Sequence, residues 1–286
     1  MQNDDCSNVT LIVVGHGATS NPDSERPVFQ HAAEVRRRGI FGAVREAFWK
    51  QQPLVTSVAA EASTPRIVVV PMFVSEGYFT EEVIPEALGF KRQGEDGFSR
   101  VQRRGEQTLY YSRPVGTHES MTKVILARAT GILEQFPFPR KTRMMETTLF
   151  IAGHGTDRNS NSRRAIEHQA DVIHSQALFR MVRAIYMEEE PRIAECHLLA
   201  TTRNIVVVPF FISDGLHATE DIPVLLGETH AAVQERLRVG QPTWRNPTER
   251  NGKLIWYAQS VGSEPLLAEV IIERASESLR SLETVQ

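Results

Sequence analysis

Long apolar runs, each closed by a glycine or a polar turn, dominate the hydrophobic pattern of this chain. Such runs, rich in β-branched residues, occupy residues 11–14, 67–73, 148–152 and 205–212. They show no alternation of apolar and polar positions, which predicts strands covered on both faces, as in a parallel sheet. The segments between them carry helix-like spacing of apolar residues. The order of strands and helices therefore predicts a doubly wound α/β fold.

The pattern occurs twice along the chain. The segment IVVVPMFVSEGYFTEEVIP at residues 67–85 returns as IVVVPFFISDGLHATEDIP at residues 205–223. A Gly-His-Gly loop that follows the first strand returns as well, with His16 and His154 at its centre. Both pairs of motifs are 138 residues apart. One fixed offset between two separate motifs indicates a tandem duplication.

We predict two domains, residues 1–139 and residues 140–286, joined by a basic linker that contains proline. Ligands of parallel α/β sheets bind beyond the carboxyl ends of the strands. The expected ligand site is therefore a cleft between the two repeats. The offset grows to 146 residues between Gly116 and Gly262, so the second repeat carries eight extra residues, which we place in the loop 229–253.

Several segments between the clear strands are predicted to be helical. Residues 40–49 and 162–187 carry helix-like patterns, and Thr117 and Ser263 are expected to be the N-caps of two further helices. The charged, glycine-containing stretch 91–107 predicts a surface loop.

Composition narrows the class of protein. A net charge of −3, with 41% hydrophobic and 23% charged residues, is typical of a globular protein and favours neither nucleic acid nor an anionic membrane as a partner. No apolar run reaches the ~20 residues of a membrane span, and the polar N-terminus does not resemble a secretory signal. Cys6 and Cys196 lie in no metal-like spacing, so we expect two unpaired thiols in a reducing cytoplasm.

The two repeats differ at one position of chemical importance. Where the second repeat has His217, the first has Phe79. Strand ends of a parallel sheet share one edge, so His154 and His217 are predicted to lie close together. Two neutral imidazoles form an open site that suits Co²⁺, Fe²⁺ or Ni²⁺, with too few ligands for a closed structural site. The alternative is that each histidine only packs at a turn.

Charged residues near these histidines are further candidates. Glu220 could supply a carboxylate, although Glu82 holds the same place in the first repeat, where it is consistent with simple charge at a helix N-terminus. Arg163 and Arg164 follow the His154 loop and could form bidentate pairs with substrate carboxylates. A solvated helix start is the alternative for both arginines.

Together these motifs resemble those of the type II, ATP-independent chelatases that act on sirohydrochlorin in cobalamin and sirohaem synthesis. The resemblance rests on the strand-GHG motif, on IVVVPxFxSxG followed by His and D-I-P, and on YYSRPVGTHESMTKVILARA at residues 110–129. It covers most of both halves and implies two similar α/β domains with a cleft between them. The family's metal-handling pair carries over to His154 and His217. Only His16 carries over in the first half, because Phe79 departs from the pattern.

The resemblance implies insertion of a divalent metal, with Co²⁺ favoured, into sirohydrochlorin. The metal is a substrate, and no further cofactor is implied. We expect His154 and His217, assisted by Glu220, to bind the metal and to carry the catalysis. We expect Arg163, Arg164 and His16 to bind the tetrapyrrole. The alternatives are a sirohydrochlorin ferrochelatase, a nickel enzyme or a non-catalytic tetrapyrrole or metal carrier. We expect a cytoplasmic monomer or homodimer with no nucleic-acid or membrane partner.

Overall fold

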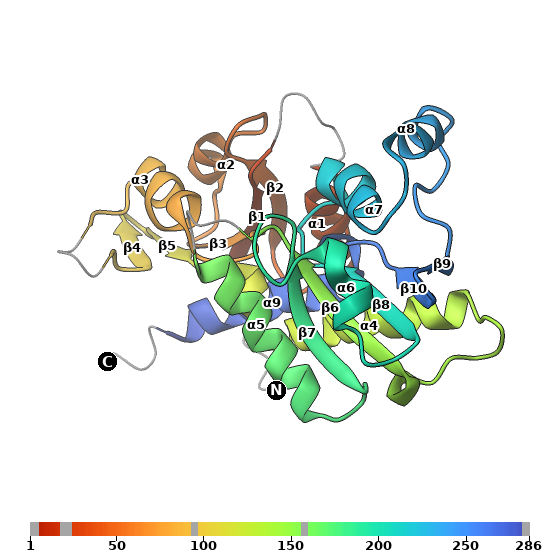
Figure 1. The fold of residues 1–286 in the computed structure, drawn as a ribbon. Helices are drawn as coiled ribbons and strands as arrows, with labels where there is room; N and C mark the ends of the chain where they lie inside the picture. Colours follow the sequence, from red (N-terminus) through yellow and green to blue (C-terminus); the bar gives the residue numbers. More distant parts are fainter. Residues whose placement is uncertain (1–5, 18–24, 93–96, 156–159, 282–286) are drawn as a thin grey trace. The chain divides into compact units, whose positions relative to one another are not determined.

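The structure is a computed structural model that describes residues 6–17, 25–92, 97–155 and 160–281. It contains two five-stranded sheets, labelled in Figure 1, with strand orders β2-β1-β3-β5-β4 and β7-β6-β8-β10-β9. Four strands of each sheet are parallel, and the edge strands β4 and β9 are antiparallel. The α/β class with mostly parallel sheets is confirmed.

The strands have the following bounds: β1 (Val9–Gly15), β2 (Ala43–Phe48), β3 (Arg66–Pro71), β4 (Val101–Arg104), β5 (Gln107–Tyr111), β6 (Thr147–Gly153), β7 (Met181–Tyr186), β8 (Asn204–Pro209), β9 (Thr248–Arg250) and β10 (Lys253–Tyr257). The α-helices are α1 (Arg26–Arg38), α2 (Val55–Glu61), α3 (Ile84–Ala87), α4 (Met121–Gln135), α5 (Ser160–Ser175), α6 (Cys196–Leu199), α7 (Ile222–Leu225), α8 (His230–Arg238) and α9 (Leu267–Arg280). Across the described residues, no helix combines the length and the apolar character that a membrane crossing requires.

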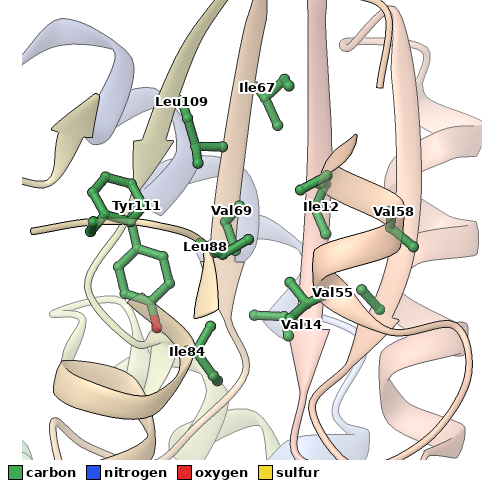
Figure 2. Close-up of a cluster of buried hydrophobic side chains, with 13 residues drawn as sticks. Ile12, Val14, Val55, Val58, Ile67, Val69, Ile84, Leu88, Leu109 and Tyr111 are labelled. Atoms are coloured by element: carbon green, nitrogen blue, oxygen red, sulfur yellow. The ribbon is translucent and has the colours of Figure 1, made fainter. Parts of the chain in front are cut away.

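The apolar runs form the central strands because both faces of each sheet are covered. Every residue of β1 and β6 is buried. Figure 2 shows one such face, where Ile12 and Val69 of the first sheet pack with Val55 from α2 and Ile84 from α3. Removing this apolar surface from water is the main stabilising contribution to each unit. Cys6 and Cys196 are buried and neither forms a disulfide, as the sequence predicted.

Two predicted helical segments contain strands instead. The prediction for residues 40–49 is wrong, since β2 lies there, and the one for residues 162–187 is correct only for α5, because β7 follows it. Both strands are sheet edges that pair on one side only, with β1 or β6. Their apolar residues are interrupted by exposed Arg45 and Arg183, a spacing that also fits a helix. Pairing with the neighbouring strand overrides that local pattern.

The loops before the last strand of each sheet are more ordered than the sequence suggests. The predicted surface loop 91–107 contains β4, which pairs with β5. The longer loop of the second repeat, 229–253, contains α8 and β9. Thr229 caps α8, because its hydroxyl accepts a hydrogen bond from the backbone N–H of Ala232.

The last helix of each repeat packs on the sheet of the other repeat. The chain forms two compact units, Met1–His118 with Pro265–Gln286, and Glu119–Glu264. In the first unit α9 contacts α1, β3 and β5, and in the second α4 contacts α5, β8 and β10. The division at residue 139 follows the sequence repeat and does not coincide with these units. A sequence period records the order of the elements, not the sheet on which a helix packs.

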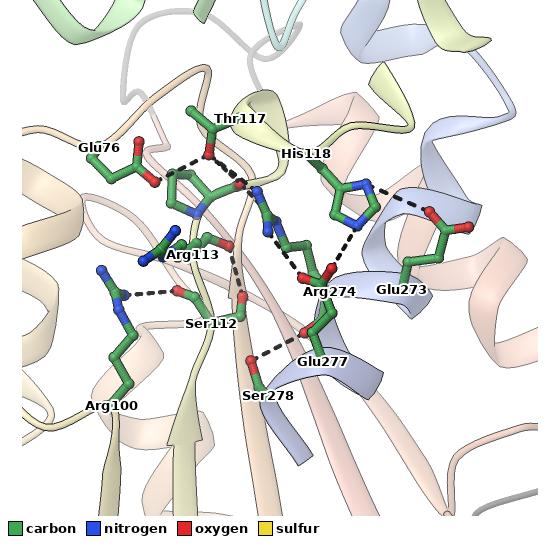
Figure 3. Close-up of polar contacts among 11 residues, drawn as sticks. Glu76, Arg100, Ser112, Arg113, Thr117, His118, Glu273, Arg274, Glu277 and Ser278 are labelled. Carbon is green, nitrogen blue, oxygen red and sulfur yellow. Dashed lines mark hydrogen bonds and ion pairs between the residues drawn. The ribbon is translucent and has the colours of Figure 1, made fainter. Parts of the chain in front are cut away.

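A buried arginine fixes α9 to the first unit. Arg274 donates from Nε to the Pro114 carbonyl (3.1 Å) and from Nη2 to the Thr117 hydroxyl (3.1 Å), and it pairs with Glu277 (2.9 Å), as Figure 3 shows. Thr117 therefore binds this arginine and is not an N-cap as predicted, since α4 begins at Met121. Burial lowers the pKa of Arg274 from a high ordinary value, so the guanidinium stays charged at neutral pH.

The second unit repeats this arrangement. Arg128 of α4 donates from Nε to the Ser260 carbonyl (3.0 Å) and from Nη2 to the Ser263 hydroxyl (2.8 Å), and it pairs with Glu264 (3.2 Å). Ser263 also donates to Asp214, so its predicted role as an N-cap is wrong, and α9 begins at Leu267. Each exchanged helix is thus fixed by an arginine that donates to a carbonyl and to a hydroxyl in a loop of the opposite repeat.

Candidate metal centre

His154 and His217 lie side by side in the second unit. His154 follows β6, and His217 begins a π-helical turn, η6 (His217–Asp221), in the loop that follows β8. The ring centroids are 4.9 Å apart and the ring planes meet at 84°. A metal–imidazole nitrogen bond is about 2.0–2.1 Å long, so the two ring edges are within reach of one ion. The structure brings together the two rings that strand topology predicts to be neighbours.

The glycines around His154 are required by close packing and by backbone conformation. A Cβ atom on Gly153 would lie 2.2 Å from Cδ1 of Ile166 in α5. Gly155 has φ of +70°, a conformation that residues with a side chain rarely adopt. The Gly-His-Gly loop therefore places the imidazole at the end of β6 while α5 packs against the strand.

The turn that carries His217 is a π-helical turn that ends just before the proline of the D-I-P motif. The N–H of Ile222 donates to the His217 carbonyl five residues earlier, which gives the wider turn. Pro223 has no N–H group and lies in the first turn of α7, a position that tolerates proline. The Tyr257 hydroxyl donates to the Ala218 carbonyl (2.6 Å), which fixes the turn from the sheet side.

Each imidazole has a carboxylate on its Nδ1 side. Asp221 Oδ2 lies 2.7 Å from Nδ1 of His217, and Glu188 Oε2 lies 3.7 Å from Nδ1 of His154. The hydrogen bond with Asp221 holds the proton of His217 on Nδ1 and leaves its Nε2 lone pair for a metal. Glu188 lies beyond hydrogen-bond distance of His154 and contributes only its charge. Nδ1 of His154 is buried, while about a third of the side chain is exposed, so the accessible part of the ring lies away from Nδ1.

Asp221 and Glu188 are site residues that the sequence reasoning missed. The 138-residue offset held a signal for both, because Val83 and Lys50 occupy the matching positions of the first repeat. Within the described ranges, no three His, Cys, Asp or Glu side chains are arranged as a complete metal site. The site is thus a pair of imidazoles, each with one carboxylate on its Nδ1 side.

Glu220 takes a different position from the one that its place in the motif suggests. Its carboxylate accepts hydrogen bonds from His230 Nε2 (3.1 Å) and Gln234 Nε2 (2.5 Å) of α8. Its neighbour Asp221 is the residue that contacts His217. A direct role of Glu220 stays a prediction, and the contacts favour a role in fixing η6 to α8.

The two candidate arginines differ in their surroundings. Arg163 pairs with Glu167 (2.9 Å) and Glu189 (2.9 Å) and lies over the Tyr186 ring, and its hydrogen bonds with these carboxylates raise its pKa. Its guanidinium is therefore engaged by carboxylates of the protein. Arg164 is exposed and forms no ion pair within the described residues. Of the two, Arg164 is better placed to receive a carboxylate from solution.

The equivalent place in the first unit has a different character. His16 packs edge-on against Phe79, with ring centroids 4.6 Å apart, and Nδ1 of His16 hydrogen-bonds to the Gly17 carbonyl (2.8 Å). Burial lowers the pKa of His16, the Gly17 hydrogen bond opposes this, and the positive charge of Lys50 lowers the pKa further. The imidazole is thus neutral at neutral pH and has no second imidazole beside it.

Comparison with known families agrees with the sequence repeat. The model of the CbiX family matches residues 10–131 and 148–278. This chain belongs to the CbiX family. The two matched segments correspond to the two sequence repeats, so each repeat is CbiX-like.

Curated CbiX relatives exist in long and short forms. This CbiX protein is 40% identical over 278 residues to a probable sirohydrochlorin cobaltochelatase from Halobacterium salinarum, with 94% of this chain and 91% of the relative covered. It is 28% identical over 149 residues to a sirohydrochlorin cobaltochelatase from Methanopyrus kandleri, with 45% of this chain and 94% of the relative covered. The second relative therefore matches a stretch about as long as one repeat.

Solved structures confirm the fold of this CbiX protein. A multi-domain protein from Deinococcus radiodurans, described as structurally similar to chelatases, aligns with a TM-score of 0.75 and 27% identity. The alignment covers 94% of this chain and 54% of that larger protein. SirB from Bacillus subtilis with Fe³⁺ aligns with a TM-score of 0.68 and 14% identity, over 96% of this chain and 97% of SirB. At that identity the likeness concerns the fold alone.

Proposed function

We propose that this CbiX protein is a sirohydrochlorin cobaltochelatase, an enzyme that inserts Co²⁺ into sirohydrochlorin without ATP in cobalamin synthesis. The observation that carries the proposal is the adjacent pair His154 and His217, each with a carboxylate at Nδ1, in a chain of this family. The names of the curated relatives favour Co²⁺ and sirohydrochlorin as substrates. We place the reaction in the cytoplasm.

The two imidazoles would first bind the incoming ion. Nitrogen ligands suit Co²⁺, and a site with few protein ligands can release the ion to the macrocycle. Nε2 of each ring is the free donor atom, because Asp221 and Glu188 face the Nδ1 atoms. The carboxylates also bring negative charge to the site, which attracts a divalent cation.

The same imidazoles would then accept protons. Metal insertion requires that the pyrrole N–H protons leave the ring, and an ordinary histidine with a pKa of ~6.5 can take a proton near neutral pH. A carboxylate near Nδ1 stabilises the imidazolium that forms. We propose that Asp221 does this for His217 through its hydrogen bond, and that Glu188 does it for His154 through its charge alone. Arg164 and His16 are proposed contacts of the tetrapyrrole.

A metal series tests the proposed function. The full-length protein is mixed with sirohydrochlorin and with Co²⁺, Fe²⁺ or Ni²⁺ in turn, and insertion is followed by the visible spectrum of the macrocycle. The expected result is catalysed insertion with Co²⁺ as the best metal. Faster insertion of Fe²⁺ would instead indicate a ferrochelatase. Binding of the macrocycle with no acceleration for any metal would indicate a carrier and contradict the proposal.

Adjacent carboxylates provide a matched test of the residues. Asp221→Asn is expected to lower kcat/KM for Co²⁺ insertion about 10- to 100-fold, because it removes the carboxylate that orients and polarises a metal ligand. Glu220→Gln keeps the contact with α8 and should change the same rate by less than about threefold. Steady-state kinetics of the two variants shows which carboxylate, Asp221 or Glu220, supports insertion, and circular dichroism checks that both variants are folded. Equal losses in both would refute the assignment to Asp221.

A further inference from the structure

Lys50 and Glu188 occupy equivalent backbone positions in the two units. The N–H of Lys50 donates to the His16 carbonyl (3.0 Å), and the N–H of Glu188 donates to the His154 carbonyl (3.2 Å). The same hydrogen bond therefore places each side chain beside the histidine of a Gly-His-Gly loop. The charge of the side chain at this position is reversed between the units: Lys50 is positive in the first and Glu188 is negative in the second.

The other two members of the site are also replaced in the first unit. Phe79 stands where His217 does, and Val83 stands where Asp221 does. Both residues lie on a π-helical turn, η2 (Phe79–Val83), of the same form as η6. The first unit thus retains the backbone of the metal centre but not its side chains. An ammonium group replaces the first carboxylate, a phenyl ring replaces the imidazole and an alkyl group replaces the second carboxylate.

These replacements take away the imidazole and the carboxylates that would attract a divalent cation. The cation of Lys50 lies 5.6 Å from the Phe79 ring centroid, and its charge acts on His16, whose pKa it lowers. An incoming metal would meet one neutral imidazole beside a positive charge, with no carboxylate from either replaced position. Electrostatics at this strand end favour an anion instead.

The surroundings of Lys50 suit a planar ligand with carboxylates. Lys50 is exposed and forms no ion pair within the described part of the chain. The Tyr78 ring lies 5.5 Å from the Phe79 ring and Tyr78 is 64% exposed, so aromatic surface remains open to solvent next to the ammonium group. An exposed cation beside open aromatic faces can bind a carboxylate and stack on a ring at once.

We infer that the cluster of Lys50, His16, Phe79 and Tyr78, here called the Lys50 cluster, binds an acidic, planar ring compound and no metal. On the proposed function, which supplies the identity of the ligand, that compound is the metal-free carboxylated tetrapyrrole. The cluster is then a tetrapyrrole contact that the second unit does not reproduce, because Glu188 would repel the same carboxylate.

Equilibrium binding tests this inference without turnover. The full-length protein, in buffer with a metal chelator, is titrated with sirohydrochlorin and the absorbance change is recorded. Lys50→Glu is expected to raise Kd about tenfold, whereas Lys50→Arg, which keeps the charge, should bind within about twofold of the original protein. The same Kd values are measured for Lys50 variants that also carry His154→Ala/His217→Ala. Lys50→Glu should raise Kd in this background too, because the Lys50 cluster does not include those two histidines.

Two further arms separate the possible outcomes. Inorganic phosphate and acetate at millimolar concentration should not displace the macrocycle; displacement by either would show a generic anion site and overturn the assignment to a ring compound. Equal Kd values for Lys50→Glu and the original protein would overturn the inference while insertion by the original protein still supports the proposed function. If the original protein inserts no metal but binds sirohydrochlorin in a manner that depends on Lys50, the proposed function is overturned. The assignment of the Lys50 cluster as a binding site is then still supported.

Discussion

The variant His154→Ala/His217→Ala is expected to lose Co²⁺ insertion into sirohydrochlorin. Both proposed steps depend on these rings, since Nε2 of each binds the ion and, once the ion has passed to the macrocycle, the same atom accepts one of the two pyrrole protons. Loss of a general base alone costs about 10²–10⁴-fold in rate. Loss of the metal ligands adds to that, so insertion should fall to the uncatalysed rate. Either single variant should lose most of the activity, because residues that act as a unit are not additive.

The matched control for this variant is His230→Ala. His230 is an exposed histidine of the same unit that contacts Glu220 and not the His154–His217 pair. Its replacement should leave insertion within about threefold of the original rate. Circular dichroism and thermal unfolding should be unchanged in the double variant, because both rings are partly exposed and neither belongs to the apolar core. Retained turnover in a folded double variant would refute the catalytic assignment.

Separating the two sequence repeats is expected to destroy the fold of the first. Residues 1–139 contain the first sheet but lack α9, which packs on β3 and β5 and buries four large apolar side chains, Leu267, Val270, Ile271 and Leu279. Burial of one such side chain stabilises by about 1.5–3 kcal/mol. Their joint loss, about 6 kcal/mol or more, is comparable to the ~5–15 kcal/mol stability of a whole domain. Residues 1–139 alone should therefore aggregate or show no cooperative unfolding.

A rearranged chain is the control for this experiment. Residues 6–118, joined through a flexible Gly-Ser linker to residues 265–281, contain the described part of the first unit with α9 and Arg274. This chain should unfold cooperatively in urea, as followed by circular dichroism. Adding Arg274→Ala should lower its stability, because Arg274 donates to the Pro114 carbonyl and to Thr117 in a buried setting. Cooperative, stable folding of residues 1–139 alone would contradict the exchange of helices.

The apolar runs predicted the fold class because central parallel strands are buried on both faces, which leaves a plain sequence signal. The edge strands β2 and β7 gave no such signal, since one side of each is open and their spacing fits a helix equally well. The exchange of α4 and α9 could not be predicted from the repeat, because a sequence period gives the order of the elements and not the sheet on which each helix packs. Thr117 and Ser263 were predicted to be N-caps because the sequence does not show which helices lie beside their hydroxyl groups. Their partners, Arg274 and Arg128, belong to the exchanged helices.

The sequence predicted the part of the candidate site that depends only on the order of the strands. His154 and His217 follow neighbouring strands, β6 and β8, so their proximity follows from the parallel sheet. Asp221 and Glu188 depend on side-chain directions, which spacing alone does not give. The contrast between repeats would have pointed to both, since each position changes its charge between the copies. The carboxylate that spacing favoured, Glu220, faces α8 instead.

One divalent ion is expected to bind between the imidazoles of His154 and His217, and a Co²⁺ titration of the protein measures this binding. The visible d–d absorption is recorded during the titration, and nitrogen ligation is read from X-ray absorption at the cobalt edge. We expect one Co²⁺ per chain with two imidazole nitrogen ligands, and loss of this site in His154→Ala/His217→Ala. Unchanged Co²⁺ binding and ligation in that double variant would show that the ion does not bind between these two rings.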